Sequence, residues 1–400
     1  MPSNHLVGPF LGINNRLPDN QLVHTERGVR LGDYLRNAVN VDLTDRGTVQ
    51  RRKGVTLVQG GGDCHSLWSS GREAYYVDSG VLYRFPRQAI AASVLAQRVS
   101  FTEAAGQVVW SDGATINKIA GNTSVPLTQP EPNPAPTVTA GGGGSLTAGL
   151  YLLAFVAVGP SGESCPTWPV QVEVPDTGNI TIQHIAPTTK VYVSAANGAE
   201  LYYYGAGTTR VALPANGPAL TTRHYRPMPP GDIVRYVRGR LLVAAGSTLF
   251  YSHPYAPGMY DPLRGYIPFT APVTMVAPVQ EGVFISADKT YFLSGADVEK
   301  SELIERLPFA AVFGTDTYSE RDESVWWYSE QGLVNGSSRG ETKLVQERTV
   351  APVVAKSGAS LFREQDGMRQ VLSALNGSEF SRAAASSFID AEVIRRERPR

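Results

Sequence analysis

Tyr75-Tyr76-Val77 leads into the turn Asp78-Ser79-Gly80, and Val81-Leu82-Tyr83-Arg84-Phe85 follows directly. Short apolar runs on both sides of a tight polar or glycine turn are typical of a β-hairpin. The same pattern recurs with turn centres near residues 46, 79, 112, 246, 288, 331 and 366. Long stretches with helical spacing of apolar residues are scarce, so the sequence predicts an all-β protein.

The spacing of these turns indicates the architecture. Apart from one gap, neighbouring turn centres lie roughly 33–43 residues apart. Strand repeats of about 40–50 residues are typical of a β-propeller, in which each blade is a small antiparallel sheet. No Trp-Asp or Gly-Gly signature recurs, and a pair of β-sandwiches is the alternative. We expect a β-propeller of five to seven blades.

The gap between the turns near 112 and 246 holds a different kind of sequence. Four prolines between Pro130 and Pro136 indicate an extended linker, and five or six strand-like runs follow within about 90 residues. One of these runs, 170–174, alternates valine with polar residues. This pattern predicts an immunoglobulin-like or fibronectin-III-like sandwich inserted between two blades.

The chain therefore divides into five predicted parts. They are an N-terminal extension at 1–37, the first part of the β-propeller at 38–132, the inserted sandwich at 133–224, the second part of the β-propeller at 225–382 and a C-terminal extension at 383–400.

Composition limits the classes of function. Charged residues make up 18% of the 400 residues and the formal net charge is zero, so the chain as a whole is not a polycation. The two cysteines cannot build a disulfide framework or a four-thiolate zinc site. No apolar run reaches about 18–20 residues, so we expect no membrane insertion. The N-terminus lacks a signal-peptide pattern, and we expect synthesis in a cytoplasm.

No catalytic constellation emerges from the motifs. The six histidines include no His-x-x-x-His pair, and neither a Gly-x-Ser-x-Gly elbow nor a phosphate-binding Gly-x-x-x-x-Gly-Lys loop occurs. Asp78, Asp112 and Asp288 fall in hairpin turns, which aspartate favours through hydrogen bonds to its own backbone. A glycosidase would need two converging carboxylates. We expect no catalytic residue, metal or cofactor, and hence no enzyme.

Two basic clusters are candidate contacts with a neighbouring subunit or with DNA phosphates. Arg51, Arg52 and Lys53 follow a predicted strand, and Arg395, Arg396 and Arg398 lie in the C-terminal extension. Phosphate contacts of lysine and arginine are the sequence-independent part of DNA binding. The alternative is a solvated turn and a solvated tail.

Several stretches resemble tail-associated structural proteins of double-stranded DNA bacteriophages. At the start of the chain they are Gly12-Ile13-Asn14-Asn15 and the run from Asn37 to Asp42, with Gly47, Arg51, Arg52 and Gly54 beyond it. The stretches 229–231, 239–244, 249–254, 273–279 and 282–284 look like the propeller core of the same family. In the insert, 146–151 and 162–164 are similar to its fibronectin-like domains.

The resemblance implies a structural virion protein of a phage tail, made in the host cytoplasm. A hub, nozzle or tail-tip ring subunit of this kind would act in tail assembly, DNA exit or fibre attachment. Its implied partners are other copies of itself in a ring and neighbouring tail or connector proteins, with genomic DNA and a host surface receptor as further candidates. The alternatives are a lectin-like module that binds the host surface and a propeller glycosidase or depolymerase.

Overall fold

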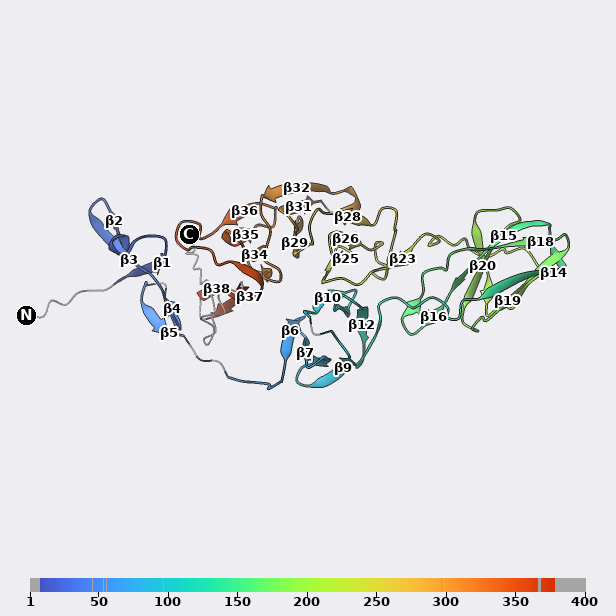
Figure 1. Ribbon diagram of the computed structural model, residues 1–400, viewed down its shortest axis with the longest axis horizontal. Helices are drawn as coiled ribbons and strands as arrows, with labels where there is room; N and C mark the ends of the chain where they lie inside the picture. Colours follow the sequence, from blue (N-terminus) through green and yellow to red (C-terminus); the bar gives the residue numbers. More distant parts are fainter. Residues whose placement is uncertain are drawn as a thin grey trace, which may run out of the picture. The chain divides into compact units, whose positions relative to one another are not determined.

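The computed structural model describes residues 8–44, 46–52, 54, 56–95, 97–295, 297–365 and 368–377. Apart from the short 3-10 turns η1 (Asp19–Gln21) and η2 (Val298–Lys300), the regular structure of these residues is β-strand (Figure 1). The chain separates into two compact units. The first comprises the described parts of Met1–Gly60 and Phe269–Arg400, and the second comprises those of Gly61–Pro268.

The second unit contains three four-stranded antiparallel sheets whose strands pair in sequence order. The first sheet consists of β6 (Cys64–Ser69), β7 (Ala74–Asp78), β8 (Val81–Arg84) and β9 (Gln88–Ala92). The second consists of β10 (Ser100–Ala104), β11 (Gln107–Ser111), β12 (Ile116–Ala120) and β13 (Thr123–Pro126). The third consists of β24 (Ile233–Val237), β25 (Arg240–Ala245), β26 (Thr248–Tyr251) and β28 (Tyr266–Pro268). Four-stranded antiparallel sheets of this kind are the blades of β-propellers.

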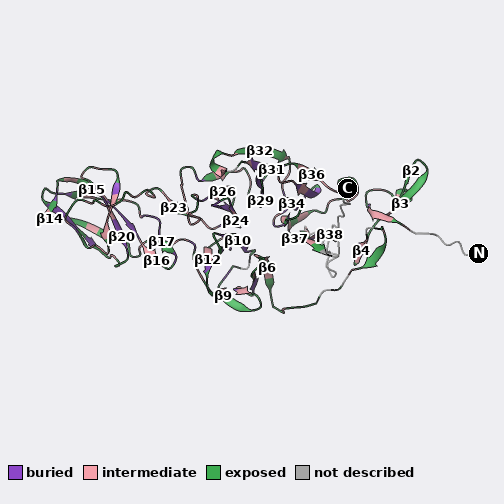
Figure 2. Cartoon of the chain, turned by 180° about the vertical axis from the view of Figure 1, so that it is seen from behind, coloured by how far each residue is buried: buried purple, intermediate pink, exposed green. Residues whose placement is uncertain are grey.

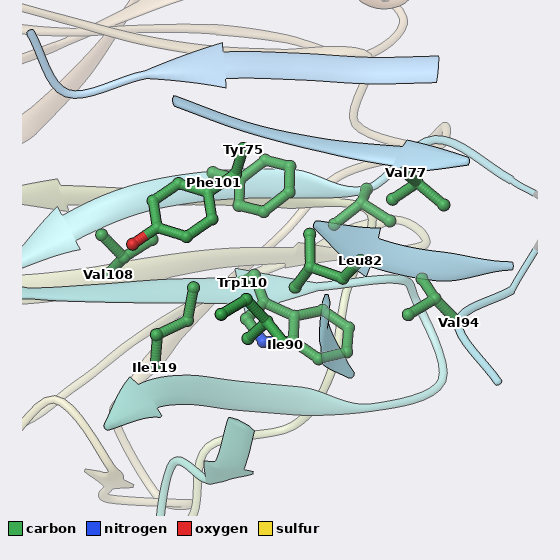
Figure 3. Close-up of a cluster of buried hydrophobic side chains, with 10 residues drawn as sticks. Tyr75, Val77, Leu82, Ile90, Val94, Phe101, Val108, Trp110 and Ile119 are labelled. Atoms are coloured by element: carbon green, nitrogen blue, oxygen red, sulfur yellow. The ribbon is translucent and has the colours of Figure 1, made fainter. Parts of the chain in front are cut away.

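The first two of these sheets share one apolar core (Figure 3). Tyr75 and Val77 from β7 meet Phe101 from β10 and Trp110 from β11. The rings of Tyr75 and Phe101 stack with centroids 6.3 Å apart. Tyr76 is buried as well, so β7 is covered on both faces, which explains its continuous apolar sequence.

A two-sheet sandwich lies between the second and third of these sheets in the sequence. One sheet consists of β14 (Thr137–Leu146), β19 (Gly178–Gln183) and β22 (Arg210–Val211). The other consists of β18 (Val170–Val174), β15 (Gly149–Val156), β20 (Lys190–Ser194) and β21 (Leu201–Ala206). Buried side chains from both sheets form one core, among them Phe155, Ile180 and Val191. The immunoglobulin-like or fibronectin-III-like topology of this insert stays a prediction.

The chain enters and leaves the sandwich at neighbouring positions. The hydroxyl of Thr128, before the sandwich, donates to the carbonyl of Gly258 at 2.6 Å. The backbone N–H of Met228, after the sandwich, donates to the same carbonyl at 2.9 Å. Two short pairs complete this region, β16 (Val158–Gly159) with β17 (Gly162–Glu163) and β23 (Arg226–Pro227) with β27 (Met259–Tyr260). Adjacent ends are what allows a domain to be inserted without disturbing its host.

The first unit contains two further blade-like sheets and a long hairpin. The first sheet consists of β29 (Met275–Val279), β30 (Gly282–Ser286), β31 (Thr290–Ser294) and β32 (Glu302–Leu307). The second consists of β33 (Thr317–Ser319), β34 (Ser324–Ser329), β35 (Gly332–Gly336) and β36 (Thr342–Leu344). The hairpin pairs β37 (Ala355–Gln365) with β38 (Met368–Gly377). Trp327 and Phe284 occupy the core between the two sheets, with ring centroids 5.3 Å apart.

The start of the first unit forms two small sheets. In one, β3 (Val29–Leu35) lies between β1 (Phe10–Ile13) and β2 (Val23–Glu26). In the other, β4 (Val41–Leu43) pairs with β5 (Val49–Arg51). We call residues 8–60 the N-terminal segment.

The predicted fold class is confirmed: the protein is all-β and of the β-propeller class. The predicted domain bounds remain a prediction. Residues 10–35, most of the predicted N-terminal extension, contain the three-stranded sheet described above.

Candidate subunit contact surface

The N-terminal segment has strands but no apolar core of its own. Among its described residues only Asn14, Gly32 and Asp42 are buried, and none of them has an apolar side chain. All four residues of β2 and all three of β5 are exposed, as the colours of these strands in Figure 2 show. A small sheet needs an apolar face packed against another element to be stable in water. The segment therefore presents surface that is suited to a partner.

Val23, Val29 and Leu31 are exposed apolar side chains of the three-stranded sheet. Val23 on β2 pairs with Asp33 and Val29 on β3 pairs with Glu26, and a β-bulge lies between the two pairs, so Val23 and Val29 lie on opposite faces of the sheet. Their exposed fractions are 50% for Val23, 63% for Val29 and 41% for Leu31.

Hydrogen bonds connect the N-terminal segment to the rest of its unit. The N–H of Asn15 donates to the carbonyl of Thr349 at 3.0 Å, and the side-chain oxygen of Asn15 accepts from the N–H of Ala351 at 2.7 Å. Within the segment, the N–H of Phe10 donates to the carbonyl of Gly47 at 2.7 Å. Gly47 has a φ of +73°, and a Cβ there would lie 2.7 Å from that of Pro9, so this turn requires glycine.

A buried polar chain links the β4–β5 hairpin to the β37–β38 hairpin. The Nε and Nη2 of Arg52 donate to Oδ1 of Asp42 at 3.2 and 3.1 Å. The amide of Gln370 donates to the same oxygen at 3.3 Å, and its own Oε1 accepts from Nε of Arg363 at 2.8 Å. Asp42 and Gln370 are both buried, so each depends on these partners.

The candidate basic residues have different surroundings. Arg51 is exposed on β5, whereas Arg52 is half-buried against Asp42 and acts inside its own unit. Lys53, Arg395, Arg396 and Arg398 lie outside the described residues. The role of the whole set in subunit or DNA contacts stays a prediction.

Asp112 and Asp78 both accept hydrogen bonds from backbone N–H groups. Asp112 accepts from the N–H groups of Ala114 and Thr115, within its own turn as expected. Asp78 instead accepts from the N–H groups of Gly62 and Asp63, in the segment before β6. The N–H of Asp63 contributes most to holding the pKa of Asp78 below its usual value, with further contributions from the Ser79 hydroxyl, the Gly62 N–H and the Arg87 guanidinium.

Trp168 is a candidate binding residue that the sequence analysis missed. It lies on the sandwich, it is 70% exposed, and the guanidinium of Arg226 stacks on its ring 3.6 Å from the centroid. Nε and Nη2 of Arg226 are buried without a hydrogen-bond partner. The signal in the sequence was a tryptophan between Pro166 and Pro169, outside any alternating run. Trp326 and Trp327, by contrast, are buried and belong to cores.

The described residues contain no group of three or more side chains suited to a metal ion. Cys165 is buried, and this burial raises the pKa of its thiol to about 12, so the thiol stays protonated near neutral pH. Within the described part of the chain, no helix is long and apolar enough to cross a membrane.

No family model and no curated protein matches the chain. Among solved structures it is similar to BBS1N in complex with ARL6DN, with 11% identity over 80% of this chain and 91% of that one and a TM-score of 0.31. It is also similar to YCF48 bound to D1 peptide, with 15% identity over 76% of this chain and 84% of that one and a TM-score of 0.27. Similarities at this level support no argument about the structure or function of this chain.

Proposed function

We propose that this chain is a structural subunit of a phage tail, as a hub, nozzle or tail-tip ring protein. It would act in tail assembly, DNA exit or fibre attachment, together with other copies of itself and with neighbouring tail or connector proteins. The proposal rests first on the stretches that resemble tail-associated proteins, several of which lie in the N-terminal segment. It includes no catalytic step.

The observation that carries the proposal is the N-terminal segment itself. Five strands without a buried apolar side chain contribute little to the stability of a lone subunit. Ordering a backbone costs about 1–2 kcal/mol per residue, which a free protein recovers mainly by burying apolar surface. Such a segment is suited to a protein that functions between neighbours.

The experiment is to express the chain with a small affinity tag from its own genome and to purify DNA-containing particles on a density gradient. Mass spectrometry is expected to find the chain in the particles at a fixed copy number, and labelling of the tag is expected to mark the tail. A matched chain lacking 383–400, with Arg395, Arg396 and Arg398, is expected to enter fewer particles. Recovery of the full chain only outside particles would contradict the proposal.

Trp168 favours a second candidate function, a module that binds sugars of the host surface. An exposed indole can stack on the apolar face of a pyranose ring, and Arg226 fixes the opposite face of this indole. The test is binding to a glycan array by the purified chain and by Trp168→Ala, with Leu213→Ala, another exposed apolar residue of the insert, as the control. Binding that Trp168→Ala alone abolishes supports this function, and absence of binding by the native chain contradicts it.

A further inference from the structure

We infer that the junction between the sandwich and the β23–β27 pair binds an acidic sugar, whose carboxylate pairs with Arg226 while its ring packs on Trp168. The inference deepens the second candidate function and rests on it. It goes further by assigning a charge to the sugar and by naming the atoms that recognise this charge.

The first step is the guanidinium of Arg226. Its Nη1 donates to the carbonyls of Tyr225 at 2.8 Å and Pro166 at 3.4 Å. Its Nε and Nη2 are buried and have no hydrogen-bond partner among the described residues. A buried charged group without a partner is costly, and each such group in a native protein needs an explanation. An acceptor from outside the chain supplies one.

The second step is the chemistry of the unpaired edge. Nε and Nη2 lie on one side of the planar guanidinium, and such an edge binds both oxygens of a carboxylate or two oxygens of a phosphate. One guanidinium balances the single charge of a carboxylate, whereas a phosphate monoester carries about −1.5 to −2 at pH 7. The edge of Arg226 therefore fits a carboxylate better.

The third step is the charge around Arg226. Burial raises the pKa of Tyr260 and that of Cys165, and the positive charge of Arg226 acts against both rises. Both groups are therefore near Arg226 and neutral near pH 7, so neither balances its charge. The carboxylate of Glu131 also contributes to the raised pKa of Cys165, but Glu131 is exposed in the proline-rich linker. Glu131 is the candidate partner from within the chain, and the experiment tests it.

The fourth step is the position of Trp168. Its ring lies over one face of the guanidinium, 3.6 Å from Cζ to the ring centroid, yet the residue is 70% exposed. Trp168 does not belong to the apolar core of the sandwich, so its indole can rotate without disturbing that core. Rotation opens this face of the guanidinium, and the free indole surface then packs on the apolar face of a pyranose ring. A pyranose that carries a carboxylate satisfies both residues.

The experiment compares acidic oligosaccharides with their own methyl esters, which keep the sugar ring and remove the charge. The probes end in glucuronic, galacturonic or sialic acid, and isothermal titration calorimetry measures their binding to the full-length chain. The native chain is expected to bind at least one acid about tenfold or more tightly than its ester, because the ester loses the charge-assisted pair. This comparison uses the native chain alone, so it does not depend on the folding of a variant.

Three variants assign the binding to Arg226, and circular dichroism checks that each of them folds. Arg226→Lys keeps the charge but lacks the two-pronged edge, so it is expected to bind the acid about tenfold or more weakly and the ester unchanged. Arg223→Met is the matched control, because the Arg223 side chain donates to the carbonyl of Ala199, and it is expected to bind as the native chain does. Glu131→Gln is also expected to bind as the native chain does.

The inference is overturned if none of the acids binds better than its ester, or if Arg226→Lys binds the acids as the native chain does. Binding of the acids by Glu131→Gln alone also overturns it, because Glu131 would then occupy the edge of Arg226. In each of these cases, Trp168-dependent binding of other glycans on the array leaves the second candidate function standing. Absence of binding to every glycan removes both the second candidate function and the inference.

Discussion

At the scale of single residues, buried polar side chains connect elements that are far apart in the sequence. Gln370 is an example, because its amide donates to Asp42 while its carbonyl oxygen accepts from Arg363. Two hairpins far apart in the sequence are thereby joined through one side chain. Net hydrogen-bond energies are modest, but a buried group left without its partner costs about 1–3 kcal/mol.

We therefore expect Gln370→Leu to destabilise the protein by about 1–3 kcal/mol, because it removes hydrogen bonds from buried Asp42 and from Arg363 while keeping a similar volume. The measurement is the urea midpoint at pH 7. Gln331→Leu, in the exposed turn between β34 and β35, is the control and should change the free energy of unfolding by less than about 0.5 kcal/mol. Equal midpoints for the native chain and Gln370→Leu would contradict this role.

Asp78 gives a prediction about pH. Its pKa is lowered in the folded state, chiefly by the N–H of Asp63, so its contribution is present above the unfolded pKa of about 3.9 and is lost as the pH falls through the folded value. Asp78→Asn should therefore differ from the native chain more at pH 7 than near pH 3. Urea midpoints at both pH values test this, with Glu330→Gln at an exposed turn as the control. A difference that is independent of pH would exclude the carboxylate as its source.

At the scale of elements, hydroxyl groups connect two neighbouring four-stranded sheets of the second unit. The Ser100 hydroxyl on β10 accepts from the N–H of Val234, and Thr102 accepts from the N–H of Tyr236 on β24, at 3.0 and 2.9 Å. Ser111 at the end of β11 is fully buried, and its hydroxyl donates to the carbonyl of Gly231 at 2.7 Å. These contacts satisfy backbone groups of the next sheet that its own ladder leaves free.

We expect Ser111→Ala to destabilise the second unit by about 1–3 kcal/mol, since both the carbonyl and the N–H of buried Gly231 lose a partner. Thermal unfolding followed by circular dichroism measures the effect. Ser247→Ala in the exposed turn between β25 and β26 should leave the melting temperature unchanged. A melting temperature for Ser111→Ala equal to that of the native chain would contradict this stabilising role of the hydroxyl.

The observed hairpins show which turns could be predicted from the sequence. Six of the seven predicted turns lie between paired strands, and the seventh, near 366, lies outside the described residues between β37 and β38, which pair. Central hairpins were predictable because strands buried on both faces are continuously apolar. The sequence did not distinguish the hairpins near 46 and 366, which form two-stranded sheets, from those in complete blades. Whether a hairpin gains outer strands depends on segments elsewhere in the chain, so its own sequence does not predict this. The exposure of Trp168 depends on tertiary packing, which the alternation of apolar and polar residues along a strand does not encode.

At the scale of the whole molecule, the sandwich is a separable body. The members of its core all come from residues 138–215, and no side chain of the neighbouring sheets takes part. Polar contacts connect it to the rest of the second unit: the Nζ of Lys118 on β12 donates to the carbonyl of Ser161 at 3.1 Å, and Nη1 of Arg226 on β23 donates to the carbonyl of Pro166 at 3.4 Å. A domain of this size with its own core and adjacent ends can fold alone.

The isolated fragment 133–224 is therefore expected to fold and to unfold in one cooperative transition. Tyr151, Leu153 and Phe155 on β15 are buried within the sandwich and do not need the rest of the chain. Dispersed amide signals in NMR and a sigmoidal urea curve are the expected results. Leu153→Asp is the control, because a carboxylate in this core should abolish both signals. A fragment that remains unfolded would mean that the polar contacts at Ser161 and Pro166 stabilise the sandwich, and the predicted boundary at 133–224 would then be wrong.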